Sequence, residues 1–175
     1  TITSNDISTI DGTKNIIFLC EKYRVKKLIY ISTCNVYGVA DYESGYHVTE
    51  SSPLEHNPEK RGSYTYNKLI SEKLVQAEIA EGNVNVVCVR PGTYFGDGIE
   101  YFTPLMGFSL KNRLFITIGH NDLRLPLVCV DNVASAILEI LKNRSCVGKT
   151  YNIVDENQMT KKQYTNIFIK KLFPN

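Results

Sequence analysis

The stretch KLIYISTCNVYG, residues 27–38, contains a short apolar run followed at once by small polar residues. An apolar run without polar alternation is typical of a parallel strand that is covered on both faces. Ser32, Thr33 and Cys34 then stand at the carboxyl end of this strand, which is where ligands bind in open α/β sheets. The stretch therefore predicts an α/β fold with polar side chains at the ligand-binding edge of its sheet.

Helix and strand patterns alternate on both sides of this stretch. A helical pattern at 12–23 precedes the strand, a long polar segment at 38–63 follows it, and a second helix is predicted at about 64–81, ending at Gly82. Further expected features are strands at 83–90, 114–119, 125–130 and 149–155, a helix capped by Asp131, and a terminal helix with a Thr160 and Gln163 capping box. This order predicts a mostly parallel sheet with helices on both faces.

The composition restricts the class of protein. The 175 residues, 43% hydrophobic and 22% charged, suffice for a single domain with a substantial core. The net charge of +2 is small and the basic residues are dispersed, so we expect no nucleic-acid partner. Five cysteines without C-x-x-C spacing are typical of free thiols in a reducing, cytoplasmic compartment. No apolar run approaches membrane-spanning length, and the three histidines lack ligand spacing, so we expect neither a membrane segment nor a metal site.

A second candidate feature is SYTYNKLISEKL, residues 63–74, at the start of the second predicted helix. Tyr64 and Lys68 are four residues apart and therefore share one helix face. An ammonium beside a phenol lowers the pKa of the phenol, which would let Tyr64 move a proton at a carbinol oxygen near neutral pH. Tyr66 points elsewhere and is the weaker candidate. A pair with this spacing also occurs as an ordinary surface pair, but the Thr33 hydroxyl at the neighbouring strand end favours a proton-transfer site.

Seven stretches of the chain occur in a consistent order. They are GTKNII (12–17), VKKLIYISTCNVYG (25–38), TESSPLEHNP (49–58), YTYNKLISEKLV (64–75), VRPGTYFGDG (89–98), LPLVCVDNVASAILEIL (125–141) and GKTYNIVD (148–155). Together they resemble the motifs of the extended short-chain dehydrogenase/reductases, also called the NAD-dependent epimerase/dehydratase superfamily. The resemblance implies an α/β fold with a Rossmann-like, mostly parallel sheet and a small C-terminal substrate-binding portion.

The resemblance also implies how the chain is organised. We expect a single domain over 1–175, with a partial Rossmann-like core at about 1–95 and 125–148 and a substrate-binding portion at about 96–124 and 149–175. The glycine-rich G-x-x-G-x-x-G turn of the family and the acidic residue that follows it are absent. The fold is therefore expected to be incomplete at its N-terminus, to expose an edge of the strand at 27–32, and to bind NAD(P) very weakly or not at all in isolation.

Carried over residue by residue, the resemblance assigns a role to each candidate. Thr33 would bind the substrate oxygen, Tyr64 would be the catalytic acid/base, and Lys68 would bridge the ribose hydroxyls of the cofactor and lower the pKa of Tyr64. The cofactor is NAD or NADP, and its nicotinamide ring would lie against Pro91, Gly92, Thr93 and Tyr94. The expected substrate contacts are Thr33, Cys34, Asn35, Thr93 and Arg124. The implied reaction is hydride exchange with an alcohol or ketone carbon.

Several readings of the function stay open. The first is an oxidoreductase or epimerase for a sugar nucleotide or a related small hydroxylated molecule, working as a homodimer through the helices at 12–23 and 64–81. Cys34 and Asn35 replace the Asp-Glu pair of the family's dehydratases, which argues against a 4,6-dehydratase. Thr93 replaces an epimerase asparagine, which favours a hydroxysteroid-dehydrogenase-like reductase. The absent glycine-rich turn favours a non-catalytic fragment or scaffold that cannot bind cofactor.

Overall fold

The computed structural model of the chain describes residues 4–43, 45–96, 107–110, 114–117, 122 and 124–170. The chain divides into a first unit, Thr1–Gly92 with Ser135–Ile153, and a second unit, Thr93–Ala134 with Val154–Asn175. Each unit is described by itself below. The predicted roles of a cofactor core and a substrate-binding portion stay predictions.

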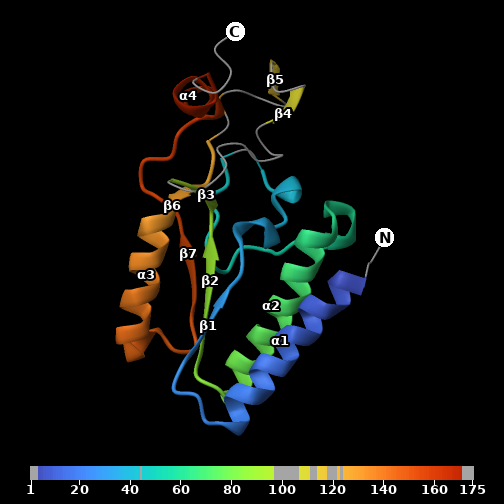
Figure 1. The fold of residues 1–175 in the computed structure, drawn as a ribbon, viewed down its shortest axis with the longest axis vertical. Coiled ribbons are helices and arrows are strands. Elements are labelled where there is room, and N and C mark those ends of the chain that lie inside the picture. Colours follow the sequence, from blue (N-terminus) through green and yellow to red (C-terminus); the bar gives the residue numbers. More distant parts are fainter. Residues whose placement is uncertain are drawn as a thin grey trace. The chain divides into compact units, whose positions relative to one another are not determined.

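The first unit is built on three parallel strands. They are β1 (Leu28–Ile31), β2 (Val86–Pro91) and β7 (Thr150–Ile153), in the order β1-β2-β7. Helices α1 (Ser4–Lys22) and α2 (Ser63–Glu81) lie side by side along one face, and α3 (Val130–Lys142), which belongs to this unit from residue 135 on, lies on the other (Figure 1). The predicted α/β class and mostly parallel sheet are therefore confirmed.

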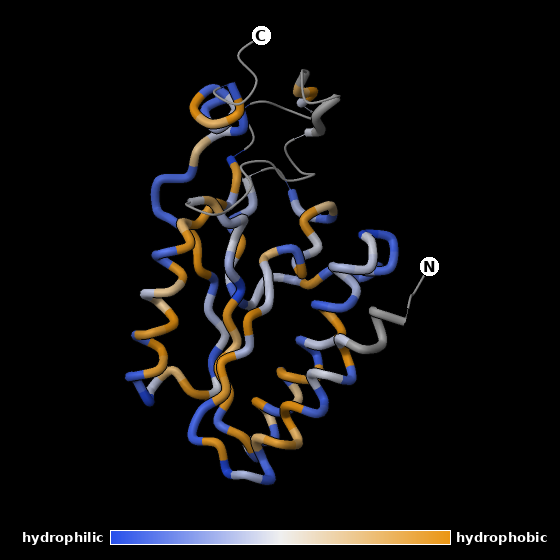
Figure 2. Tube along the Cα trace, viewed as in Figure 1, coloured by the Kyte–Doolittle hydropathy of each residue, from blue (hydrophilic) through white to orange (hydrophobic). Residues whose placement is uncertain are grey.

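The central strand β2 explains why helices are needed on both faces. All six of its residues are buried. Val86 and Cys88 pack in a cluster with residues of α1 and α2, whereas Val87 and Val89 pack with Ile140 of α3. This alternation follows from the two-residue period of a strand, which sends successive side chains to opposite faces. Hydrophobic positions accordingly run along the strands, and hydrophilic ones gather in the turns at their amino ends (Figure 2).

The strand predicted at 27–32 differs from the expectation in one respect. It was expected to be covered on both faces, but β1 is only half-buried and its last residue, Ile31, is 41% exposed. Among the described strands, β1 pairs with β2 alone, so it stands at the edge of the sheet. The fully covered strand of the sheet is β2, because β2 has a neighbour on each side.

The helix boundaries confirm some local signals and correct others. The helix predicted at 12–23 begins earlier, at Ser4, and the one predicted at about 64–81 is α2. Gly82 ends α2 in the left-handed conformation with φ 75°, as its position predicted. Asp131 was expected to cap α3, but the helix begins at Val130, so Asp131 lies inside the first turn.

A more distant carboxylate serves the start of α3 instead. Within the second unit, Asp155 accepts hydrogen bonds from the Cys129 amide at 3.0 Å and from the Asn132 side chain at 2.8 Å. Because Asp155 lies far along the chain from this helix end, the local spacing of Asp131 pointed to the wrong partner.

The second unit contains two short strand pairs and the terminal helix. Strand β3 (Thr93–Phe95) pairs in parallel with β6 (Leu127–Cys129), and β4 (Gly107–Leu110) pairs antiparallel with β5 (Leu114–Thr117). The last two residues of the strand predicted at 114–119 lie outside the described residues. Helix α4 (Lys161–Tyr164), which continues as the π-helix η5 (Thr165–Ile169), begins with the predicted Thr160 and Gln163 capping box.

Four short 3-10 helices of the described chain lie in the segments that connect these elements. They are η1 (Cys34–Val36), η2 (Val39–Asp41), η3 (Pro58–Arg61) and η4 (Arg144–Cys146). All five cysteines are free thiols. Across the described ranges, we find no helix with the length and apolar character needed to cross a membrane.

Candidate active site

The candidate site begins where β1 ends. The Ser32 amide still donates to the Val89 carbonyl at 2.8 Å, which extends the sheet by one residue. Thr33 then caps the short helix η1, since its side-chain oxygen accepts a hydrogen bond from the backbone amide of Asn35 at 3.3 Å. Thr33, which is 7% exposed, is therefore held at the carboxyl end of the strand by its own local fold.

The first two turns of α2 lie against this strand end. The Lys68 ammonium donates to the Ile31 carbonyl at 2.8 Å, two residues before Thr33, and burial lowers the pKa of Lys68. Tyr64 lies one turn earlier on the same helix face and is 56% exposed, so its phenol can reach a ligand. The structure thus brings Lys68 and the strand end of Thr33 together, and the exposed Tyr64 lies one turn away on the same helix.

Tyr30, which the sequence did not single out, flanks this arrangement. The Lys68 nitrogen lies 5.7 Å from the centroid of the Tyr30 ring, within the range of a cation–π contact. Burial raises the pKa of Tyr30 to about 12, so this phenol stays neutral over the physiological range. The charge of Lys68 is therefore not cancelled by its aromatic neighbour.

Cys34 and Asn35, the predicted substrate contacts after Thr33, form the start of η1. Burial raises the pKa of the Cys34 thiol to about 11. Its sulfur lies 4.0 Å from the Asn35 side-chain oxygen. Cys34 is therefore a partly buried, protonated thiol, and its contribution to a site would be shape and polarity. A substrate role for either residue stays a prediction.

A buried ion pair behind the strand end was missed by the sequence reasoning. Glu72 is fully buried and Arg90 is 3% exposed. Glu72 Oε1 lies 2.5 Å from Arg90 Nη2 and 2.9 Å from Arg90 Nε, and Glu72 Oε2 accepts the hydrogen bond of the Ser32 hydroxyl. Burial by itself would lower the pKa of Arg90, but its bonds to Glu72 and Tyr37 raise it above the ordinary value. The available signal was an arginine at the end of an otherwise apolar strand, because such a charge needs a buried partner.

Arg90 also ties the long segment after η1 to the sheet. Its Nη1 donates to the Tyr37 hydroxyl at 2.7 Å and to the Glu50 carbonyl at 2.9 Å. The Tyr37 hydroxyl donates in turn to the Asn152 side-chain oxygen at 2.7 Å. The backbone amide of Asn152 donates to the Glu50 carboxylate at 2.8 Å. The polar segment predicted at 38–63 is therefore fastened to β2 and β7 by hydrogen bonds.

The other predicted contacts fall in different places. Pro91 ends β2, and the Gly92 amide donates to the Ile153 carbonyl at 2.9 Å in the first unit. Thr93 and Tyr94 form part of β3 in the second unit. Arg124, also in the second unit, donates from Nη1 to the Gln158 carbonyl at 3.2 Å. Their predicted roles toward cofactor and substrate stay predictions.

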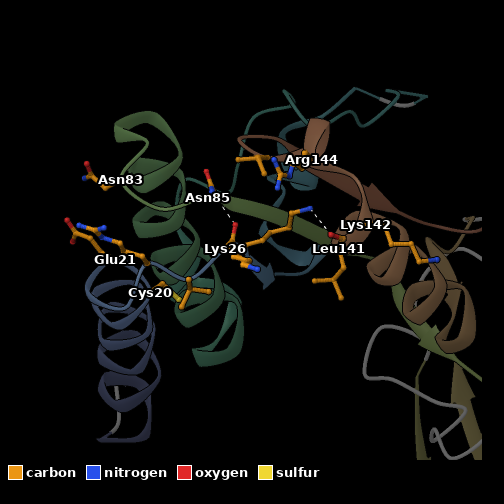
Figure 3. A pocket seen from close by; sticks show the side chains of 12 residues that line it. Cys20, Glu21, Lys26, Asn83, Asn85, Leu141, Lys142 and Arg144 are labelled. Carbon is orange, nitrogen blue, oxygen red and sulfur yellow. Dashed lines mark hydrogen bonds between the residues drawn. The ribbon is translucent and has the colours of Figure 1, made fainter.

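A hollow lies at the opposite end of the sheet. It has a volume of about 700 Å³ and is lined by the ends of α1 and α3 and by the residues that precede β1 and β2 (Figure 3). Its basic side chains are Arg24, Lys26, Lys27, Lys142 and Arg144. Ligands of open parallel sheets bind at the carboxyl ends of the strands, so this amino-end hollow is not the candidate active site.

Comparisons with known proteins agree with the fold. Residues 4–154 match the sequence model of the NAD dependent epimerase/dehydratase family. The chain is 30% identical over 184 residues to the bifunctional polymyxin resistance protein ArnA of Wigglesworthia glossinidia brevipalpis, covering 95% of the chain and 28% of ArnA. It is 31% identical over 146 residues to the decarboxylating sterol-4-alpha-carboxylate 3-dehydrogenase erg26 of Schizosaccharomyces pombe, covering 82% of the chain and 41% of that protein.

A solved structure shows the same fold. The dTDP-glucose 4,6-dehydratase DesIV of Streptomyces venezuelae, solved with NAD and TYD bound, superimposes with a TM-score of 0.75 at 22% identity, covering 95% of the chain and 50% of DesIV. The chain thus spans half or less of the length of each of these three proteins.

Proposed function

Because the chain belongs to the NAD dependent epimerase/dehydratase family, we propose that it carries the proton-transfer site of an NAD(P)-dependent oxidoreductase or epimerase. Its substrate would be a sugar nucleotide or a related hydroxylated molecule, and the reaction would take place at an alcohol or ketone carbon of that molecule. The observation that carries this proposal is the hydrogen bond of Lys68 to the strand end beside Thr33, with the exposed Tyr64 one turn away.

Each of the three residues has a distinct task in the proposed reaction. A bound nicotinamide cofactor would supply the hydride donor or acceptor. Thr33 would hydrogen-bond the substrate oxygen and orient the carbinol carbon. Tyr64 would take the hydroxyl proton as that carbon is oxidised and would return a proton to the oxygen in the reverse direction, which balances the reaction.

The donor chemistry of the site fits the ribose end of such a cofactor. An ammonium has three hydrogens to donate, and the Ile31 carbonyl accepts one from Lys68, so two remain for ribose hydroxyls. NAD occupies the solved relative DesIV, which supports a nicotinamide cofactor in this fold. The chain itself lacks a G-x-x-G-x-x-G turn, so the pyrophosphate would need a cradle from elsewhere.

A second candidate function is a hydroxysteroid-dehydrogenase-like reductase. The 31% identity to a sterol-4-alpha-carboxylate 3-dehydrogenase favours it, as does Thr93 at the position where many family epimerases carry asparagine. Both candidates use the same three residues. They differ in the substrate and in whether the hydride returns to it. Parallel assays of the full-length protein with UDP- and dTDP-sugars and with 3β-hydroxysteroids separate them.

Tyr64→Phe tests the shared chemistry. In the full-length protein we expect it to lower turnover by at least about 100-fold, because the proton acceptor is lost. Cofactor affinity, measured by calorimetry, should change little. Tyr66→Phe is the matched control and should keep normal turnover. Equal activity of Tyr64→Phe and the unaltered protein would refute the assigned role, and a full-length protein without cofactor binding would favour the scaffold reading.

A further inference from the structure

One face of α2 carries polar side chains at every fourth residue. They are Tyr64, Lys68, Glu72 and Gln76. Residues four apart on a helix lie on the same face, so these four form a continuous stripe along α2. Three of the four make hydrogen bonds to strands of the sheet or to the residues that follow them.

The stripe reaches a different strand at each step. Gln76 donates to the Thr150 hydroxyl of β7 at 2.9 Å, Glu72 accepts from Arg90 of β2, and Lys68 donates to the Ile31 carbonyl of β1. The helix is thereby fixed along the sheet at three points. The position of the fourth side chain, Tyr64, is set by these three contacts, because Tyr64 lies on the same helix face.

Glu72 has a special place in this stripe because its two oxygens are committed to different elements. Oε1 accepts two hydrogen bonds from the Arg90 guanidinium, and Oε2 accepts the hydroxyl of Ser32, the residue immediately before Thr33. Arg90 is itself anchored by Tyr37 and by the Glu50 carbonyl. A single carboxylate therefore links α2, β2 and the end of β1.

Stability alone does not require charges at these positions. A buried ion pair can often be replaced by apolar side chains of similar size without loss of stability. Apolar side chains, however, have no preferred direction, whereas the guanidinium fork fixes both distance and angle to a carboxylate. The feature that the ion pair adds over an apolar core is a defined register between α2 and the strand end.

We propose that Glu72 and Arg90 are positioning residues, which hold the Thr33 hydroxyl through Ser32 and hold Tyr64 and Lys68 through α2, so that the two reactive hydroxyls meet one substrate oxygen. The inference rests on the proposed function, which it deepens. Neither residue touches the reacting atoms, and their effect passes through Ser32 and through the helix.

The first test separates positioning from stability in the full-length protein. The variant Glu72→Met with Arg90→Met replaces the ion pair by apolar side chains, and Ser32→Ala removes only the hydrogen bond of the Ser32 hydroxyl to Glu72. We expect the double variant to melt at a lower temperature, because the Ser32 hydroxyl and the Glu50 carbonyl lose their partners. Among the molecules that stay folded, kcat should fall by about 100-fold at little changed KM, as for a small misplacement of reacting groups. Ser32→Ala should lower kcat by about tenfold.

A matched control lies on the same helix. Glu78 is also buried, and its carboxylate accepts the Val84 amide at 2.7 Å, away from the strand end. Glu78→Gln should alter the melting temperature and leave kcat per folded molecule unchanged. Normal kcat in a folded Glu72→Met, Arg90→Met variant would overturn the inference. If that variant does not fold, normal kcat in Ser32→Ala overturns it equally.

A second measurement does not depend on turnover. Hydrogen exchange of the amides at 33–36 should become at least about tenfold faster in Ser32→Ala than in the unaltered protein, and should stay unchanged in Glu78→Gln. If the unaltered protein turns over neither class of substrate, the proposed function has failed, and the exchange rates still decide the positioning role. Unchanged exchange at 33–36 in Ser32→Ala would then reject it.

Discussion

The two ends of the parallel sheet differ in the surroundings of their charged side chains. At the carboxyl end, the charges of Glu72 and Arg90 are buried and paired. At the amino end, five basic side chains and one acidic one, Glu21, line a hollow of about 700 Å³. A hollow of this size with an excess of basic side chains would point to the amino end as the site. The exposed phenol of Tyr64 on a buried, fully compensated support selects the carboxyl end.

The basic character of the amino end has a structural explanation. The Lys27 ammonium donates to the carbonyls of Ile140, Leu141 and Asn143 at 2.6, 3.0 and 2.8 Å. These carbonyls lie at the C-terminal end of α3, where the last turn lacks amide partners and the helix dipole is negative. At least one cation of the hollow is therefore engaged in ending a helix, and it is not free for a ligand.

The largest expected effect comes from breaking the buried ion pair at the carboxyl end. Glu72→Ala removes one partner of the buried pair and leaves the Arg90 charge unpaired, which should lower the free energy of unfolding by about 3–5 kcal/mol. Urea unfolding measures it. Glu139→Ala is the control, because the pair of Glu139 with Lys142 is exposed on both sides, at 74% and 69%. That change should lower the free energy by no more than about 1 kcal/mol, and equal losses would contradict the comparison.

A smaller effect concerns the reactivity of the carboxyl end. Burial raises the pKa of Cys34 to about 11, so the folded chain holds the thiol proton at pH values where an unfolded chain has begun to release it. Because the thiolate is the reactive form, alkylation of Cys34 by iodoacetamide at pH 8 should be about 100-fold slower in the folded chain than in urea. Peptide mass spectrometry follows this site alone. Equal rates would show that the thiol is open and ionised.

The smallest effect tests the amino end. Lys27→Met removes three hydrogen bonds to the end of α3 and should lower the free energy of unfolding by about 1–2 kcal/mol. The neighbouring Lys26 lines the same hollow with an exposed side chain, so Lys26→Met should change stability by less than about 0.5 kcal/mol. If both variants bound an anion such as inorganic phosphate less well than the unaltered protein, the hollow would be a ligand site after all.

Sequence patterns predicted the features whose partners are close along the chain. The partners of the capping box, Thr160 and Gln163, are three positions apart, and Gly82 ends its own helix, so both were predicted correctly. The cap of α3 was wrong because Asp155 replaces the adjacent Asp131.

The polar support of the site shows the same limit more strongly. Tyr64 and Lys68 share a helix face that the spacing alone predicts. The pairing of Glu72 with Arg90 and Ser32 joins three separate elements, and no local pattern specifies which carboxylate meets which strand. A sequence can report that a buried arginine needs a partner, but the identity of that partner depends on how the helix packs on the sheet.

The four-residue stripe on α2 has a consequence for insertions and deletions. Each residue turns an α-helix by about 100° and advances it by about 1.5 Å. One extra residue between Lys68 and Glu72 would therefore rotate Tyr64 and Lys68 away from the strand end whenever Glu72 keeps its partner. Gly45 is an exposed turn position with open space around it. An extra residue beside it would disturb neither the Glu72 pairing nor the placement of Tyr64 and Lys68. Chain length should thus be strictly limited in α2 and free to vary at that turn.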